Sequence, residues 1–151
     1  MIAKLLKNIP GTAPKRADPS LICAIGDVHG EAERLSRLHR LILERHAAHF
    51  PEHRLKIVHL GDYVDRGPDS ARVIETCQRL ELNPDVECVF LKGNHEDILI
   101  RFLDTADGLS DWLMNGGRDT LAGYGIEISN IFQSTSDPDT IRQSLADAMP
   151  G

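Results

Sequence analysis

The sequence is poor in cysteine, in basic residues and in long apolar runs. Its three cysteines are an odd number at wide spacings in apolar runs, which predicts buried reduced thiols rather than a disulfide framework. No apolar stretch approaches the roughly eighteen residues that a membrane span needs, so we expect no membrane partner. The 17 Lys and Arg against 23 Asp and Glu give a formal net charge of -6, which argues against a nucleic-acid partner. The N-terminus shows no secretory signal, and a cytoplasmic location is therefore expected.

The chain divides into a short leader and one long domain. Prolines and basic residues crowd residues 1–20, which predicts a flexible basic leader. The remaining segment, residues 21–151, has the length of one ordinary domain. Its composition is globular, because the chain is 41% hydrophobic and 26% charged.

Short apolar runs alternate with segments of helical periodicity. The apolar runs predict strands at 21–25, 55–60 and 86–91. The periodic segments predict helices at 31–50, 69–82 and 96–103, and short helices near 120–124 and 139–149. Because strand–helix–strand crossovers join parallel strands, this order predicts an α/β fold with a mostly parallel sheet. In the first helix, the buried stripe is expected to contain Leu35, Leu38, Leu41 and Ile42.

Polar residues suited to metal binding follow each predicted strand. They lie in the segments 26–30 (GDVHG), 61–67 (GDYVDRG) and 93–96 (GNHE). The carboxyl ends of parallel strands meet at one edge of a sheet, where α/β proteins bind ligands. Asp27, His29, Asp62 and Asn94 combine carboxylate, imidazole and amide groups, a set that suits Mn²⁺, Fe or Zn²⁺. Two such ions can share a carboxylate, and Asp62, from the middle strand in sequence, is the expected bridge.

Neighbouring side chains can act on a phosphate ester. Arg66 can grip phosphate oxygens, and Asn94 is expected to contact the substrate as well. His95 can protonate the leaving oxygen, with Asp65 orienting its ring.

The remaining aromatic residues leave alternatives open. His59 lies in an apolar strand and is expected to be a core histidine. His46, His49 and His53 could form a metal site, although cations also sit well at a helix C-terminus and are solvated there. Trp112 is either a wall of the substrate cleft or a structural anchor.

The three motifs resemble the N-terminal signatures of the calcineurin-like metallophosphoesterases. GDYVDRG resembles the form in protein serine/threonine phosphatases and their bacterial and phage relatives, and so does WLMNGG at 112–117 followed by Thr120. The resemblance covers residues 21 to about 125 and implies the N-terminal part of an αββα sandwich. It implies two divalent metal ions, with manganese as the first expectation and iron or zinc as alternatives. The implied metal ligands are Asp27, His29, Asp62 and Asn94, the implied general acid is His95 paired with Asp65, and the implied phosphate ligand is Arg66.

The resemblance implies hydrolysis of phosphomonoesters by direct attack of a metal-bound hydroxide, with a phosphorylated protein as substrate. One alternative is a dinucleoside polyphosphate hydrolase, and another is a non-catalytic fragment that binds one metal or a phosphorylated partner. Two further histidine ligands of the family are missing, because no histidine follows His95. We therefore expect a domain truncated in its C-terminal half, with an incomplete second metal site.

Overall fold

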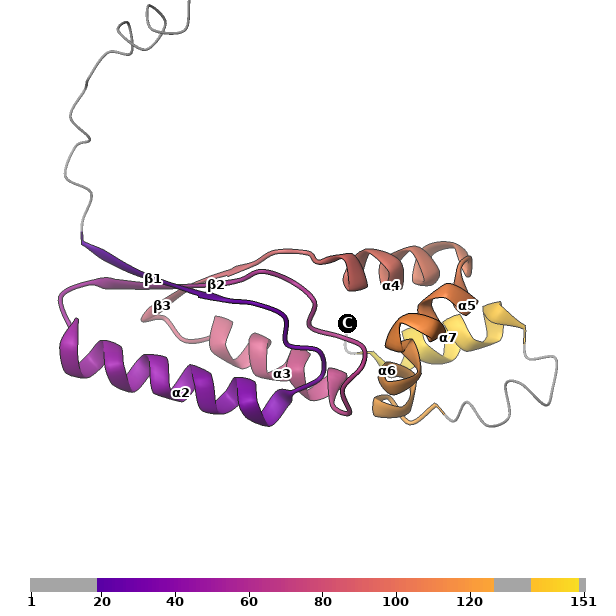
Figure 1. The fold of residues 1–151 in the computed structure, drawn as a ribbon, viewed down its shortest axis with the longest axis horizontal. Coiled ribbons are helices and arrows are strands. Elements are labelled where there is room, and N and C mark those ends of the chain that lie inside the picture. Colours follow the sequence, from indigo (N-terminus) through magenta and orange to yellow (C-terminus); the bar gives the residue numbers. More distant parts are fainter. Residues whose placement is uncertain (1–18, 127–136, 150–151) are drawn as a thin grey trace, which may run out of the picture.

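Three parallel strands form the centre of the structure, a computed structural model that describes residues 19–126 and 137–149 (Figure 1). The strands are β1 (Ser20–Ile25), β2 (Arg54–His59) and β3 (Val86–Phe90), and they lie in the order β1-β2-β3. The predicted parallel α/β architecture is confirmed, and β2 is the middle strand in space as well as in sequence. The predicted leader, residues 1–20, falls almost entirely outside the described residues.

Two long helices cover one face of this sheet. α2 (Ala32–His49) follows β1, and α3 (Ser70–Glu81) follows β2 (Figure 1). Leu55, Ile57 and His59 alternate along β2 and are buried against these helices, as the two-residue repeat of a β-strand allows. In the described part of the chain, no helix is long and apolar enough to cross a membrane.

The opposite face of the sheet exposes apolar side chains. Ile22 of β1 is 61% exposed, and Leu60 and Leu91, which follow β2 and β3, are 50% and 46% exposed. Among the described residues, Figure 1 shows no helix over this face. A sheet face of this kind favours association with another apolar surface.

The buried stripe of α2 differs from the prediction. Leu35 is buried as expected, but Leu38 and Leu41 are 38% and 48% exposed, whereas His39 is only 5% exposed. Ala32, Leu35 and His39 recur at helical spacing and face the sheet. A histidine takes the place of a leucine because its Nε2 atom lies 2.9 Å from Nε2 of His59, which supplies a buried hydrogen bond.

A group of helices lies beyond the carboxyl ends of the strands (Figure 1). It begins with α4 (Asn94–Thr105), which follows β3. The others are α5 (Leu109–Trp112), the segment η1 (Leu113–Gly117), which is kinked at Gly116, α6 (Arg118–Gly123) and α7 (Pro138–Ala148). The two short helices expected near 120–124 and 139–149 are confirmed, whereas α5 and η1 were not predicted. Within this group, the buried rings of Phe102 and Trp112 stack with centroids 5.1 Å apart and belong to the same hydrophobic core as the sheet.

The cysteines are free, as predicted, but only one is fully buried. Cys77 is buried on α3, while Cys23 and Cys88 are partly exposed. Burial, with Cys88 nearby, raises the pKa of the Cys77 thiol to about 12, which leaves it protonated and unreactive at neutral pH.

Candidate metal centre

The loops that follow the three strands converge on one point beyond the sheet (Figure 1). His29 and Asp62 come from the loops after β1 and β2, His95 comes from the first turn of α4, and each offers a ligand atom within 4.8 Å of the others. Asp62 joins the loops, because its carbonyl accepts the backbone N–H groups of Val28 and His29, each at 2.9 Å. Its Oδ1 accepts the backbone N–H of His95 at 3.1 Å. Asp62, in the loop after β2, thus contacts both the loop after β1 and the start of α4.

The imidazole of His29 is oriented for ligation through one nitrogen. Its Nδ1–H donates to the carbonyl of Val64 at 2.9 Å, which leaves the lone pair on Nε2. Nε2 lies 3.8 Å from Oδ2 of Asp27 and accepts a hydrogen bond from the Arg66 guanidinium at 3.0 Å. An ion bound at Nε2 would replace the contact from Arg66.

Backbone strain is concentrated in these loops. His29, Asp62, Asp65 and Arg66 have φ angles of 43°, 55°, 70° and 67°, in the left-handed region that non-glycine residues rarely adopt. Ala106 is the only other such residue among those described. Each strained residue costs about 1–3 kcal/mol and persists only where its surroundings hold it, which is typical of functional sites.

Glycines allow the loops to come this close. A Cβ atom on Gly93 would overlap with the backbone and carboxylate of Asp62, and one on Gly67 would overlap with the carbonyl of His29. Gly93 begins the third motif and Gly67 ends the second. Glycine is required at both positions because any side chain would prevent the close approach of the loops.

Behind the cluster, His95 and Asp65 form a buried pair. The Nδ1–H of His95 donates to Oδ2 of Asp65 at 2.8 Å, and the two side chains are 1% and 0% exposed. This contact leaves Nε2 of His95 as the nitrogen available to the cluster. The ring of His95 meets that of His29 edge-on, with centroids 4.7 Å apart.

The other expected ligands lie at the solvent-exposed rim. The side chain of Asp27 is 68% exposed and points toward His29, and Asn94 is the exposed first residue of α4. His29 and Asp62 are thus brought together with His95, whereas Asp27 and Asn94 stand at the margin. Their assignment as ligands remains a prediction, as do the roles of Arg66, Asp65 and His95.

Glu96 organises the site and was given no role from the sequence. Its carboxylate accepts the backbone N–H groups of Asp62 at 2.7 Å, Tyr63 at 2.8 Å and Val64 at 3.3 Å. It also accepts the N–H of Gly93, the N-cap residue of α4, at 2.9 Å, which is one of the two hydrogen bonds of a capping box. The signal was present in the sequence, since Glu follows the glycine of GNHE at the third position of a helix.

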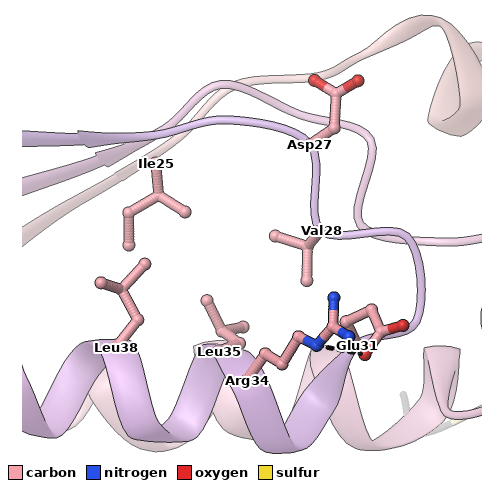
Figure 2. A pocket seen from close by; sticks show the side chains of 7 residues that line it. All are labelled: Ile25, Asp27, Val28, Glu31, Arg34, Leu35 and Leu38. Atoms are coloured by element: carbon pink, nitrogen blue, oxygen red, sulfur yellow. Dashed lines mark ion pairs between the residues drawn. The ribbon is translucent and has the colours of Figure 1, made fainter.

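A pocket of about 170 Å³ lies next to the site and shares Asp27 with it. Its floor is the apolar space between β1 and α2, formed by Ile25, Val28 and Leu35, and Arg34 pairs with Glu31 at its rim at 3.3 Å. Figure 2 shows that the carboxylate of Asp27 points away from this space. The chemistry therefore lies on the other side of the loop from the pocket.

Three sequence alternatives are decided by burial and contacts. Trp112 is 0% exposed, so the structural interpretation is confirmed and the cleft-wall alternative is wrong. His59 is a core histidine as predicted, also 0% exposed. Nε2 of His46 contacts the carbonyl of His53 at 2.7 Å, and no group of three metal-binding side chains is found there among the described residues.

The chain matches known proteins over the segment that carries this site. It is 40% identical over 97 residues to serine/threonine-protein phosphatase 2 of Escherichia coli (strain K12), a match that covers 64% of this chain and 38% of that protein. It is 37% identical over 81 residues to the asymmetrical bis(5'-nucleosyl)-tetraphosphatase PrpE of Anoxybacillus flavithermus (strain DSM 21510 / WK1), covering 52% of this chain and 32% of that protein. The chain thus spans about a third of the length of these curated relatives. A family model described as calcineurin-like phosphoesterase matches residues 20–142, which include all three loops, and the chain belongs to that family.

Proposed function

We propose that this chain carries the N-terminal part of the active site of a hydrolase that cleaves phosphomonoesters, with phosphoserine or phosphothreonine in proteins as the substrate. The observation that carries the proposal is the meeting of His29, Asp62 and His95 beyond the ends of three strands, with His95 backed by a buried carboxylate. Similarity to a bacterial serine/threonine-protein phosphatase supports the choice of substrate.

The residues present fit one divalent metal ion. Asp27, His29 and Asp62 supply two carboxylates and an imidazole whose free nitrogen faces them, a donor set that suits manganese, iron or zinc. Asp62 and Asn94 remain as protein ligands for a second ion, so this second site is incomplete within the chain. When bound, such ions polarise phosphoryl oxygens and lower the pKa of a coordinated water molecule.

His95 is the proton donor in this mechanism. Its Nδ1–H is held by Asp65 at 2.8 Å, so the proton that leaves is the one on Nε2, and the carboxylate stabilises the charged ring beforehand. Transfer of that proton to the leaving oxygen avoids release of a free alkoxide. General-acid catalysis of this kind contributes about 10²–10⁴ in rate.

Arg66 is the phosphate ligand. Its guanidinium is exposed and lies 3.0 Å from His29, which places its positive charge at the mouth of the cluster. Its backbone N–H donates to the carbonyl of Gly116 at 3.2 Å, and this bond helps to hold its left-handed conformation. A planar guanidinium at this position can bind two phosphate oxygens at once.

Two alternatives remain. Similarity to a bis(5'-nucleosyl)-tetraphosphatase favours a dinucleoside polyphosphate as the alternative substrate, in which the bond cleaved would be a phosphoanhydride rather than a monoester. A chain that spans about a third of its relatives could also bind one metal or a phosphorylated partner without turnover. The free thiols fit a reducing compartment such as the cytoplasm.

The test is hydrolysis with Mn²⁺ of a serine phosphopeptide, diadenosine tetraphosphate and 4-nitrophenyl phosphate, with Asp62→Asn as the inactive control. Preferred release of phosphate from the phosphopeptide supports the proposal. Preferred cleavage of the dinucleotide would replace the substrate assignment. Metal binding without hydrolysis of any of the three would favour the non-catalytic alternative.

A further inference from the structure

The carboxylate of Asp65 is surrounded by hydrogen-bond donors. Besides the His95 ring, it receives the indole N–H of Trp112, which is forked over Oδ1 at 3.0 Å and Oδ2 at 3.1 Å. The hydroxyl of Thr120 lies 2.7 Å from Oδ1. All four side chains are at most 1% exposed, so water does not compete for these bonds. Since each partner donates, Asp65 is an ionised acceptor whose position is defined on both oxygens.

The direction of each hydroxyl bond follows from counting protons. Thr120 has one hydroxyl proton, and the carboxylate of Asp65 takes it. The hydroxyl of Ser70, 3.0 Å from that of Thr120, must therefore donate to Thr120. The backbone N–H of Asp65 in turn donates to Thr120 at 2.9 Å and to Ser70 at 3.2 Å. Thr120 thus holds both the main chain and the side chain of Asp65.

The glycines after Trp112 make this geometry possible. A Cβ atom on Gly117 would overlap with the indole ring of Trp112. Gly116 adopts a φ of 105°, and its carbonyl accepts the backbone N–H of Arg66. The kink at Gly116 within η1 therefore brings an indole and a carbonyl onto two consecutive residues, Asp65 and Arg66.

We propose that Trp112 and Thr120 are positioning residues, which fix the Asp65 carboxylate so that it holds the His95 ring with Nε2 turned toward the cluster. Packing alone does not require them, because a phenylalanine at position 112 could also stack on Phe102, and a valine at 120 would fill similar space. What tryptophan and threonine supply beyond packing is the indole N–H and the hydroxyl group, which both donate to the Asp65 carboxylate. The inference rests on the proposed role of His95 as proton donor, but the contact it concerns can be measured without turnover.

The experiment follows the Nδ1–H proton of His95 by NMR in the ¹⁵N-histidine-labelled, metal-free 151-residue chain. The signal is assigned by its absence in His95→Asn. Thr120→Val removes the hydroxyl and keeps the shape, while Thr120→Ser keeps the hydroxyl. Trp112→Phe removes the indole N–H and keeps an aromatic ring. Ser70→Ala is the matched control, because Ser70 contacts Thr120 and the backbone N–H of Asp65 but not the carboxylate.

Thr120→Val and Trp112→Phe should each speed solvent exchange of the His95 Nδ1–H by about tenfold, as loss of one hydrogen bond to a charged acceptor implies, whereas Thr120→Ser and Ser70→Ala stay within about twofold of the wild type. Unchanged exchange and ring shifts in Thr120→Val, with only lower stability, would overturn the proposal. If Trp112→Phe does not fold, the Thr120 pair decides alone. Failure of every substrate to react would remove the proposed function and leave this result standing.

Discussion

His39 on α2 and His59 on β2 share a hydrogen bond of 2.9 Å between their Nε2 atoms, inside the interface of the helix and the sheet. The residues are 5% and 0% exposed, and Phe90 stacks on the His59 ring with centroids 4.9 Å apart. One nitrogen must donate and the other accept, so at least the accepting ring is neutral in the folded protein. Burial, followed by the nearby His59, lowers the pKa of His39 to about 4, and burial lowers the pKa of His59 as well.

Stability should therefore fall in mild acid. Because the folded state lowers these pKa values below the ordinary 6.5, the unfolded chain binds the extra protons as pH falls. The contribution of the pair is complete above pH 6.5 and is lost as pH falls toward 4, on the order of 3 kcal/mol for His39. Urea unfolding at both ends of this range measures the loss.

The matched comparison uses two histidines of the same helix. His39→Leu should reduce the difference in unfolding free energy between the two pH values, since one of the two titrating groups is gone. His49→Ala, at an exposed position of α2, should leave the difference unchanged. Equal pH dependence in His39→Leu and the wild type would show that other groups cause the acid loss.

Asp62 should matter more than Asn94 for metal content. Asp62→Asn preserves the left-handed backbone, because asparagine tolerates a φ of 55°, but it removes the negative charge at the centre of the cluster. Asn94→Ala removes one exposed amide at its rim. Bound Mn²⁺, measured by metal analysis after dialysis, should drop further in Asp62→Asn, and equal retention in the two variants would exclude the bridging role.

Glu96→Ala should lower the free energy of unfolding by more than substitutions at partly exposed positions usually do. The substitution leaves the backbone N–H groups of Asp62 and Tyr63 without their acceptor, and a buried unsatisfied donor costs about 1–3 kcal/mol. Asp97→Ala is the control, because the carboxylate of Asp97, the residue after Glu96, is exposed and pairs with the solvated side chain of Lys92. Urea unfolding should show a clear loss in the first variant and little change in the second.

His95→Asn should lower kcat by about 10²–10⁴-fold while metal content is retained, if His95 is the proton donor. The loss should be smaller for 4-nitrophenyl phosphate than for phenyl phosphate, because nitrophenolate leaves without a proton. Steady-state rates on the two esters give the comparison. The same loss on both would instead indicate that His95 positions the substrate or the metal.

Gly117→Ala should damage the fold through a single methyl group. Its Cβ would overlap with the buried ring of Trp112, and overpacking of this kind costs about 1–3 kcal/mol. Gly26→Ala is the matched control, because a Cβ at Gly26 would meet nothing within 4 Å. Thermal unfolding should separate the two variants, and equal stability would mean that Trp112 can move without cost.

Local patterns were enough to predict the parts of the fold that local chemistry controls. Apolar runs that end in glycine predicted β1, β2 and β3 within a residue or two, because a buried parallel strand has no other composition. Because helical crossovers make the strands parallel, the three motifs were predicted to lie at the same edge of the sheet. His29, Asp62 and His95 do meet there, since the carboxyl ends of parallel strands necessarily share an edge.

Contacts between distant segments were beyond local patterns. Nothing near Leu38 or Leu41 shows that His39 is buried instead of them, because its partner His59 is on β2, twenty residues away. The spacing of Trp112 and Thr120 likewise carries no sign of Asp65, about fifty residues earlier in the chain.

The amino-acid sequence was sufficient to predict the strands, their parallel order and the polar residues at their ends, because these depend on composition and alternation over a few residues. Which polar atoms are paired depends on how distant segments pack. A buried donor or acceptor must find a partner wherever the packed chain offers one, and for Glu96 that partner is the loop after β2. Burial requires that Glu96 has hydrogen-bond partners. Which groups become its partners depends on how α4 and the loop after β2 pack together, and no short stretch of sequence specifies that packing.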